Sequence, residues 1–280
     1  MKRSDWHQAA RDGSIATIAR LLEDGQAADR KDRHGQTALM LAATHGHAAL
    51  VELLLDRGAA TDVTAKFGLS ALMLAIINQH ADIATMLIAA GADTALEGTG
   101  APCFAGKNAG ELAREAGAAD IADAIALDLI ARAFAHRPPP TEMSDSKQLS
   151  DVEYDEVMAF EGLRWPDLGF ERIEENADAV FWFAPEAFCY YLPGFLTAGI
   201  REGRWDTNAY DSYIGMLDRS AQREYWDDFF EPRWTLLTRP ELRAVSAWVD
   251  WFEARLPDGF HHNSYERSRD TLRLLAERYE

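Results

Sequence analysis

The stretch that decides the fold of the N-terminal half occurs twice, as GQTALMLAATHGH over Gly35–His47 and as GLSALMLAIINQH over Gly68–His80. The two runs begin 33 residues apart. A step of the same length back from the first run gives a weaker copy near the N-terminus, in which Trp6 stands in the place of Leu39. Self-similarity at one fixed period of this size is typical of repeat proteins.

Each copy is predicted to form a helix-turn-helix unit. An alanine-rich apolar segment is followed by a turn and a leucine-rich segment, and Gly58 and Gly91 stand where a helix ends in a left-handed residue. A fourth, atypical unit begins near Gly110, after an insertion of about five residues within positions 96–108. Because no single unit buries its apolar face alone, we expect four units to stack into an all-α solenoid.

These residues resemble the ankyrin repeat, and the resemblance covers about residues 1–135. The T-P-L-H signature of that family reads TALM from Thr37 and SALM from Ser70, so the proline that starts the inner helix is missing. The resemblance implies a concave surface, formed by turn tips and by the exposed face of the inner helices, that binds protein partners.

The positions of that surface include several apolar residues. Phe67, Leu69 and Ile77 stand where a solvated repeat usually carries polar groups, and Phe104 lies in the inserted loop. Such a patch marks a contact surface, either for a partner or for the second domain of this chain, and Phe67, Leu69 and Phe104 are the best anchor candidates. The full predicted partner-binding set is Arg33, His34, Gln36, Thr44, His45, Lys66, Phe67, Leu69, Ile77, Asn78 and Phe104.

The composition changes after residue 137. The prolines and polar residues of PPPTEMSDSKQLS predict a linker over 138–150, between a repeat domain at 1–137 and a helical domain at 151–280; the alternative is a surface loop within one domain. Up to Arg137 there are 13 basic and 17 acidic residues, a net charge of −4, and the remainder has 15 and 29, a net charge of −14. Seven of the eight tryptophans also lie in the second part.

Helix-start patterns predict that the second domain is all-α. Ser150 and Glu153 form a capping box, Pro185 stands in the first turn of a short helix, and Pro193 starts the next helix after a tight corner. Another helix follows Thr238, and no alternating strand pattern is present. We expect a small tryptophan-rich bundle of five to seven short helices.

Three runs in this domain resemble an uncharacterised bacterial family of small helical domains. They are WPDLGFE from Trp165, APEAFCYYLPGFL from Ala184 and PELRAVSAWVDWF from Pro240, and the signature is PEAFxYYLPxFL. The resemblance spans about residues 153–256 and implies a fold without an assigned activity.

The sequence predicts no catalytic residue, metal site or cofactor. The run from Gly98 lacks the glycine and serine or threonine positions of a phosphate-binding loop. His47 and His80 are expected to contact backbone groups, as is usual in ankyrin-like repeats. Cys103 and Cys189 form no motif, which favours a reducing cytosol, and Cys189 is expected to be a buried, inert thiol.

Acidic residues are concentrated between Glu142 and Asp178, where 12 carboxylates face only Lys147, Arg164 and Arg172. No histidine accompanies the helix-spaced pairs that these acids form. Three interpretations remain: a solvated acidic face, a docking surface for a basic protein, and acid/base or metal chemistry.

The leading functional hypothesis is a non-catalytic bacterial protein that binds a protein partner through the ankyrin surface and the acidic domain. In its most specific form, this hypothesis gives the chain an immunity or antitoxin role against a basic protein. A net charge of −18 argues against nucleic acid or an anionic membrane as partner, and with no long apolar run we expect a cytoplasmic protein. A further hypothesis makes the repeats an intramolecular scaffold. The alternative is an enzyme or small-ligand receptor whose repeats recruit the substrate and whose pocket is lined by Trp182, Tyr190, Tyr191, Trp205, Trp226, Trp234 and Trp251.

Overall fold

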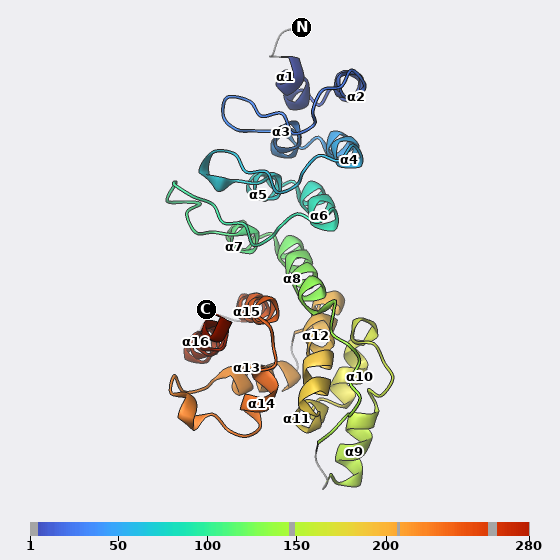
Figure 1. Ribbon diagram of the computed structural model, residues 1–280, viewed down its shortest axis with the longest axis vertical. Coiled ribbons are helices and arrows are strands. Elements are labelled where there is room, and N and C mark those ends of the chain that lie inside the picture. The colour runs from blue at the N-terminus through green and yellow to red at the C-terminus, as the bar shows by residue number, and fades with distance from the viewer. Residues whose placement is uncertain (1–4, 146–148, 206–207, 257–261, 280) are drawn as a thin grey trace. The chain divides into compact units, whose positions relative to one another are not determined.

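The computed structural model describes residues 5–145, 149–205, 208–256 and 262–279 (Figure 1). Within these ranges every regular element is a helix, and the one β-type pairing is an isolated bridge between Gly98 and Ala105. The predicted all-α fold class is therefore confirmed. The chain divides into two compact units, Met1–Ile125 and Ala126–Glu280.

The first unit is a stack of helix pairs, in which each inner helix contacts the next inner helix (α1, α3, α5, α7) and each outer helix the next outer helix (α2, α4, α6). In Figure 1 the loops that precede α3, α5 and α7 all project to the same side; we call these loops the fingers. The elements are α1 (Asp5–Arg11), α2 (Ile15–Glu23), α3 (Ala38–His45), α4 (Ala48–Asp56), the 3-10 turn η1 (Lys66–Gly68), α5 (Ala71–Ile77), α6 (Ala81–Ala89), α7 (Ala109–Glu115) and α8 (Ala119–Phe134).

Side-chain caps start the inner helices in place of the missing proline. The Thr37 hydroxyl accepts a hydrogen bond from the backbone N–H of Met40 at 3.3 Å, and Ser70 does the same for Met73 at 3.3 Å. Asn108 caps α7 in the same way. Because each cap satisfies a helix N–H that would otherwise lack a partner, the fold tolerates the departure from T-P-L-H.

Two histidines connect successive helix pairs. His47 Nε2 lies 2.7 Å from the carbonyl oxygen of Arg11, and His80 Nε2 lies 3.3 Å from that of Thr44. Each bond joins the start of an outer helix to the end of the inner helix in the pair before it. The expectation that these histidines contact backbone groups is therefore confirmed.

The same histidine rings lie against glycines that end the inner helices. A Cβ atom on Gly13 would lie 2.7 Å from the His47 ring, and one on Gly46 would lie 2.7 Å from the His80 ring. The equivalent position in the third pair is Gln79, which keeps a left-handed φ of 60°. A side chain fits there because the following pair carries Ala118, not histidine, at the matching place.

The second unit is a bundle of helices (Figure 1). The described residues contain eight α-helices, more than the five to seven expected, because α10, α11 and α14 are too short to show a clear period. The elements are α9 (Asp151–Met158), η2 (Trp165–Asp167), α10 (Phe170–Glu175), α11 (Ala179–Trp182), α12 (Pro185–Glu202), α13 (Asn208–Leu217), η3 (Arg223–Tyr225), α14 (Phe230–Trp234), α15 (Arg239–Glu253), α16 (His262–Ala276) and η4 (Glu277–Tyr279).

One predicted corner is absent from this bundle. Pro185 starts α12 as expected, but Pro193 lies inside the same 18-residue helix and begins no new one. Phe188, Leu192 and Phe195 are buried on this helix, and packing on several sides stabilises it across the missing backbone N–H.

The second half of α8 belongs to the core of the second unit. Ala126, Ile130 and Phe134 join the same buried cluster as Phe160 and Trp234. The two compact units therefore divide within α8, upstream of the proline-rich stretch at 138–150.

Candidate partner-binding surface

Backbone hydrogen bonds join the three fingers into a ladder. The N–H of Lys66 donates to the carbonyl oxygen of His34 at 3.3 Å, and the N–H of Thr99 donates to that of Phe67 at 2.5 Å. The second finger closes on itself through a bond from Ala65 N–H to the Leu69 carbonyl oxygen at 3.0 Å. Predicted site residues of different repeats are thereby held next to one another.

Phe67 is placed at the tip of the second finger by an unusual backbone. It has a φ of 67°, and the following Gly68 has a φ of 70°. Phe67 is 37% exposed, and Lys66 Nζ lies 4.7 Å from the centroid of its ring. Gly100 of the third finger lies beside it, since a Cβ on that glycine would be 3.4 Å from Phe67 Cδ1. The finger thus presents an aromatic ring beside a cation.

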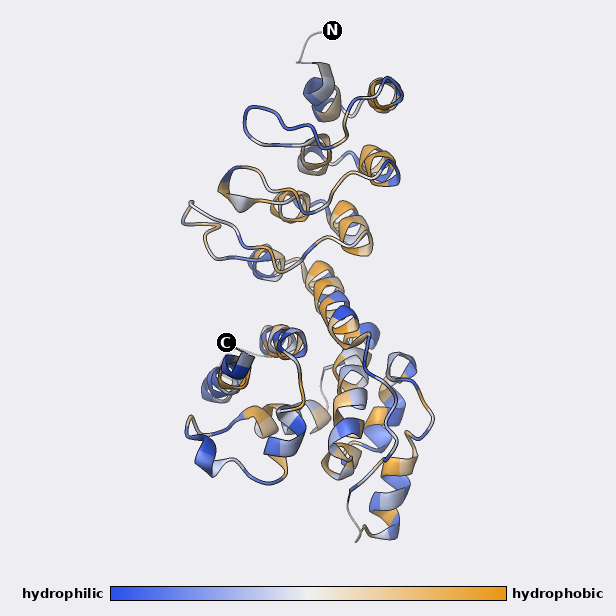
Figure 2. Ribbon diagram, viewed as in Figure 1, coloured by the Kyte–Doolittle hydropathy of each residue, from blue (hydrophilic) through white to orange (hydrophobic). Residues whose placement is uncertain are grey.

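The first finger is polar, as Figure 2 shows for the loop before α3. Asp32 Oδ1 accepts hydrogen bonds from the backbone N–H of His34 at 2.7 Å and of Gln36 at 2.9 Å. Desolvation acts to raise the pKa of Asp32, but these two bonds, together with the nearby His7 and His34, outweigh it and hold the pKa below its usual value. Arg33 and His34 are exposed on this turn, and Gln36 is half-buried.

The other predicted residues lie at the C-terminal ends of the inner helices. His45 and Asn78 are exposed, whereas Thr44 and Ile77 are half-buried. The Thr44 hydroxyl donates to the Met40 carbonyl oxygen at 2.8 Å. An inner helix of eight residues separates these positions from the finger tips by roughly 12 Å, at about 1.5 Å per residue.

The structure corrects one anchor candidate and adds another residue. Leu69 is only 7% exposed, because it directly precedes the helix cap Ser70 and its backbone closes the finger, so it is not part of an exposed patch. Phe104 is half-buried. Leu74, also half-buried, was missed; its position three residues before Ile77 puts it on the same helix face.

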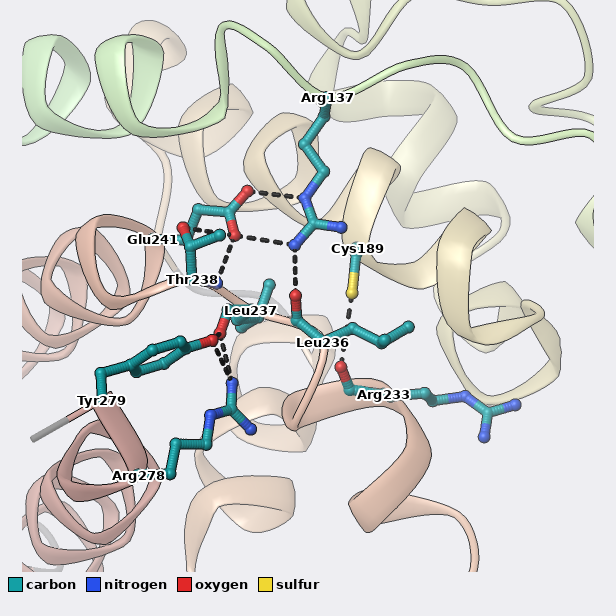
Figure 3. A network of polar contacts seen from close by, with 9 residues as sticks. All are labelled: Arg137, Cys189, Arg233, Leu236, Leu237, Thr238, Glu241, Arg278 and Tyr279. Atoms are coloured by element: carbon teal, nitrogen blue, oxygen red, sulfur yellow. Dashed lines mark hydrogen bonds and ion pairs between the residues drawn. The ribbon is translucent and has the colours of Figure 1, made fainter.

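In the second unit, the site that most resembles a chemical centre is a polar network around Cys189 (Figure 3). Arg137 makes a bidentate pair with Glu241, with Nε–Oε1 at 2.6 Å and Nη2–Oε2 at 2.7 Å, and also donates to the Leu236 carbonyl oxygen at 2.7 Å. Burial alone would lower the pKa of Arg137, but its bonds to Glu241 raise it. The Cys189 thiol donates to the carbonyl oxygen of Arg233 at 3.3 Å.

These hydrogen bonds hold Arg137 and Cys189 in place in the fold, and they do not activate the Cys189 thiol. Burial raises the pKa of Cys189 to about 12, so the thiolate that a nucleophile needs is absent near neutral pH. Cys189 is fully buried, as expected, and Cys103 is an exposed free cysteine. Arg137, at the edge of the expected linker, instead attaches the chain to the start of α15.

Most of the aromatic residues suggested as pocket walls are core residues. Trp234 packs against Phe188 and Phe230, with ring centroids 5.3 Å and 5.7 Å apart, and is fully buried. Tyr190, Tyr191, Trp226 and Trp251 are also buried, whereas Trp182 is half-buried and Trp205 is exposed. Aromatic content here reflects core packing.

No cluster of three or more potential metal ligands is found among the residues whose placement is described. In the same residues, no helix is both long enough and apolar enough to cross a membrane.

Comparison with known proteins supports the repeat unit. Residues 6–97 match the family described as ankyrin repeats, in three copies. This segment consists of ankyrin repeats. Ankyrin repeats are protein-interaction modules, so the chain takes part in protein–protein interaction through this unit. No curated protein matches the chain. The ankyrin match ends at residue 97, and the resemblance noted for residues 153–256 stays a prediction.

Proposed function

We propose that the chain is a non-catalytic binding protein for a basic protein partner, held by the fingers of the ankyrin unit and by the acidic second unit. Phe67 is the observation on which this proposal rests most. It is a large apolar side chain, exposed at a finger tip that backbone bonds to both neighbouring fingers hold in place. A rigid aromatic side chain costs little conformational entropy when a partner covers it.

The charge distribution supports a basic partner. The residues after Arg137 carry a net charge of −14, which attracts a positively charged protein and speeds its association. Nucleic acid is disfavoured as a direct partner for the same reason. The specific form of the proposal is an immunity-type inhibitor that covers the positive cleft of a basic, nucleic-acid-directed protein in the cytoplasm.

Affinity purification from the host, with quantitative mass spectrometry at low and moderate salt, tests this proposal. The bait is the full chain, compared with Phe67→Ala and with Ile15→Ala, which removes a similarly exposed apolar side chain from α2 outside the fingers. We expect a basic protein to be retained by the parent and Ile15→Ala, and lost from Phe67→Ala. Retention of only neutral or acidic proteins, or equal retention by all three baits, would contradict the proposal.

A further inference from the structure

A groove of about 360 Å³ lies within the second unit, between residues 141–144 and Leu149 on one side and residues of helix α9 on the other. This volume is at the lower end of the ~300–1,000 Å³ that ligand pockets occupy, enough for one or two aliphatic side chains. Apolar atoms come from both sides of the groove, and the polar side chains of Thr141, Ser144 and Glu161 also line it. The residues that matter here are Met143, Leu149, Tyr154, Val157, Met158 and Glu161.

Contacts with the folded core hold both sides of the groove in place. The carbonyl oxygen of Met143 accepts a hydrogen bond from the N–H of Ala184, at the start of α12, at 2.9 Å. On the other side, Val157 is buried in the core, Tyr154 and Met158 lie four residues apart on one face of α9, and Glu161 lies in the turn that follows this helix. The groove is therefore anchored on folded elements, while the unbranched methionines adapt to different apolar side chains.

The surroundings of the groove are acidic. Asp151 and Asp155 lie on α9 beside Tyr154 and Met158, and Glu161 is part of the lining. No ion-pair partner is found for these three carboxylates among the residues that the structure describes. Among the described residues that line the groove, none is a lysine or an arginine.

The two described arginines of this acidic stretch already have partners. Arg164 pairs with Asp167 at 2.8 Å, and Arg172 donates to the carbonyl oxygen of Ala159 at 2.9 Å. Lys147 lies outside the described residues. The negative field also acts within α9: desolvation and the nearby carboxylates of Asp178 and Glu153 raise the pKa of Glu156. A cationic ligand gains from this field, and an anionic one is repelled.

We propose that this groove binds a short basic segment of the partner protein, with one or two aliphatic side chains against Met143 and Met158 and with Lys or Arg opposite Asp151, Asp155 and Glu161. The inference rests on the proposed function in taking the partner to be a basic protein. It adds a second contact site, on the acidic unit, with its own side-chain preference.

Synthetic peptides test the groove without the partner. The probe is fluorescein-labelled GKRLMRKG, with GKRSSRKG as the polar control and GEELMEEG as the acidic control. Fluorescence anisotropy with the full chain is measured at about 50 and 300 mM salt. We expect GKRLMRKG to bind at least tenfold more tightly than either control, and to weaken severalfold at the higher salt.

Matched variants locate the binding site. Tyr154→Ala and Glu161→Lys should each weaken GKRLMRKG binding by about tenfold. Val152→Ala changes a side chain of the same helix that is 67% exposed and outside the lining, and Glu175→Lys makes the same charge change on α10; both should leave binding unchanged. Far-UV circular dichroism confirms that each variant is folded.

The outcomes separate this inference from the proposed function. The groove proposal would be overturned if the apolar and polar basic peptides bound equally well, or if Glu161→Lys and Glu175→Lys weakened peptide binding equally. Either result would indicate attraction by the net charge alone. Absence of peptide binding at 0.1 mM protein would also overturn it, because this concentration is ten thousandfold above the Kd of a ~10 nM complex. Phe67→Ala should leave peptide binding intact. The peptide assay therefore tests only the groove, and the partner purification tests the role of the fingers.

Discussion

The packing of His80 on Gly46 predicts a strong energetic coupling between these two residues. Gly46 has φ 77° and ψ 26°, a left-handed conformation that costs an alanine about 1–2 kcal/mol. Its new Cβ would also lie 2.7 Å from His80 Cε1 and 3.0 Å from Nδ1, so the ring must move. Because His80 Nε2 is 3.3 Å from the Thr44 carbonyl oxygen, that movement breaks a hydrogen bond worth roughly 1 kcal/mol.

We therefore expect Gly46→Ala to cost about 2–4 kcal/mol in the free energy of opening of the first unit. In a His80→Ala background only the backbone penalty remains, so the same change should cost about 1–2 kcal/mol and the coupling should be about 1–2 kcal/mol. Gly117→Ala is the matched control, because Gly117 has φ 67° and no atom lies within 4 Å of its Cβ position.

Hydrogen exchange of amides in α3 to α6, measured by mass spectrometry on the full chain, gives the local opening free energies, and urea unfolding followed by circular dichroism gives the global effect. The reasoning is refuted if Gly46→Ala and Gly117→Ala cost the same, or if His80→Ala leaves the cost of Gly46→Ala unchanged within about 0.3 kcal/mol.

Three further predictions concern the second unit and the cysteines. A maleimide reagent should label Cys103 in the native chain and Cys189 only in denaturant, because Cys103 is exposed and burial raises the pKa of Cys189 to about 12. Mass spectrometry measures the labelling, and rapid labelling of both cysteines in the native chain would contradict the burial of Cys189 in the core. Glu241→Ala should destabilise the second unit in urea by about 3–5 kcal/mol, since it leaves Arg137 without its carboxylate and removes the cap of α15, whereas Glu277→Ala at an exposed site should cost under about 0.5 kcal/mol. Glu156→Gln should stabilise the fold by about 0.5 kcal/mol at pH 7, after allowance for solvent screening. The folded-state pKa of Glu156 lies above its ordinary value of 4.5, so its charge destabilises the fold as pH rises, and the gain from glutamine should disappear as pH falls below that value; a gain that is constant from pH 4 to pH 8 would contradict this sign.

Local patterns predicted the helices well because the forces that start and end helices are local. The cap at Ser150 needs only a hydroxyl and a carboxylate three residues later, and it is present in the structure. At Thr238 the Glu241 carboxylate, also three residues later, accepts hydrogen bonds from the Thr238 N–H and hydroxyl. Pro193 was misread because its tolerance depends on packing around α12, which no neighbouring residue encodes. The pair between Arg137 and Glu241 joins residues 104 positions apart, and nothing near Arg137 in the sequence indicates its partner.

The repeat register predicted which residues belong to the finger surface, but it could not predict how far each one is exposed. Phe67 and Leu69 are two positions apart and equally apolar, yet one is 37% exposed and the other 7%. The difference arises from the turn itself. Positive φ angles at Phe67 and Gly68 direct the chain so that Leu69 closes the base of the finger while Phe67 stands at its tip.

The strain at Phe67 separates its role in folding from its role in binding. A phenylalanine at φ 67° costs roughly 1–2 kcal/mol relative to a residue that tolerates this conformation. If Phe67 served only the fold, an asparagine would be preferred, because it adopts a left-handed backbone more readily. Phe67→Asn should therefore raise the stability of the first unit by about 0.5–1 kcal/mol in hydrogen exchange and still abolish retention of the partner. A variant that is less stable and still binds would show that Phe67 supports the finger and is not its contact residue.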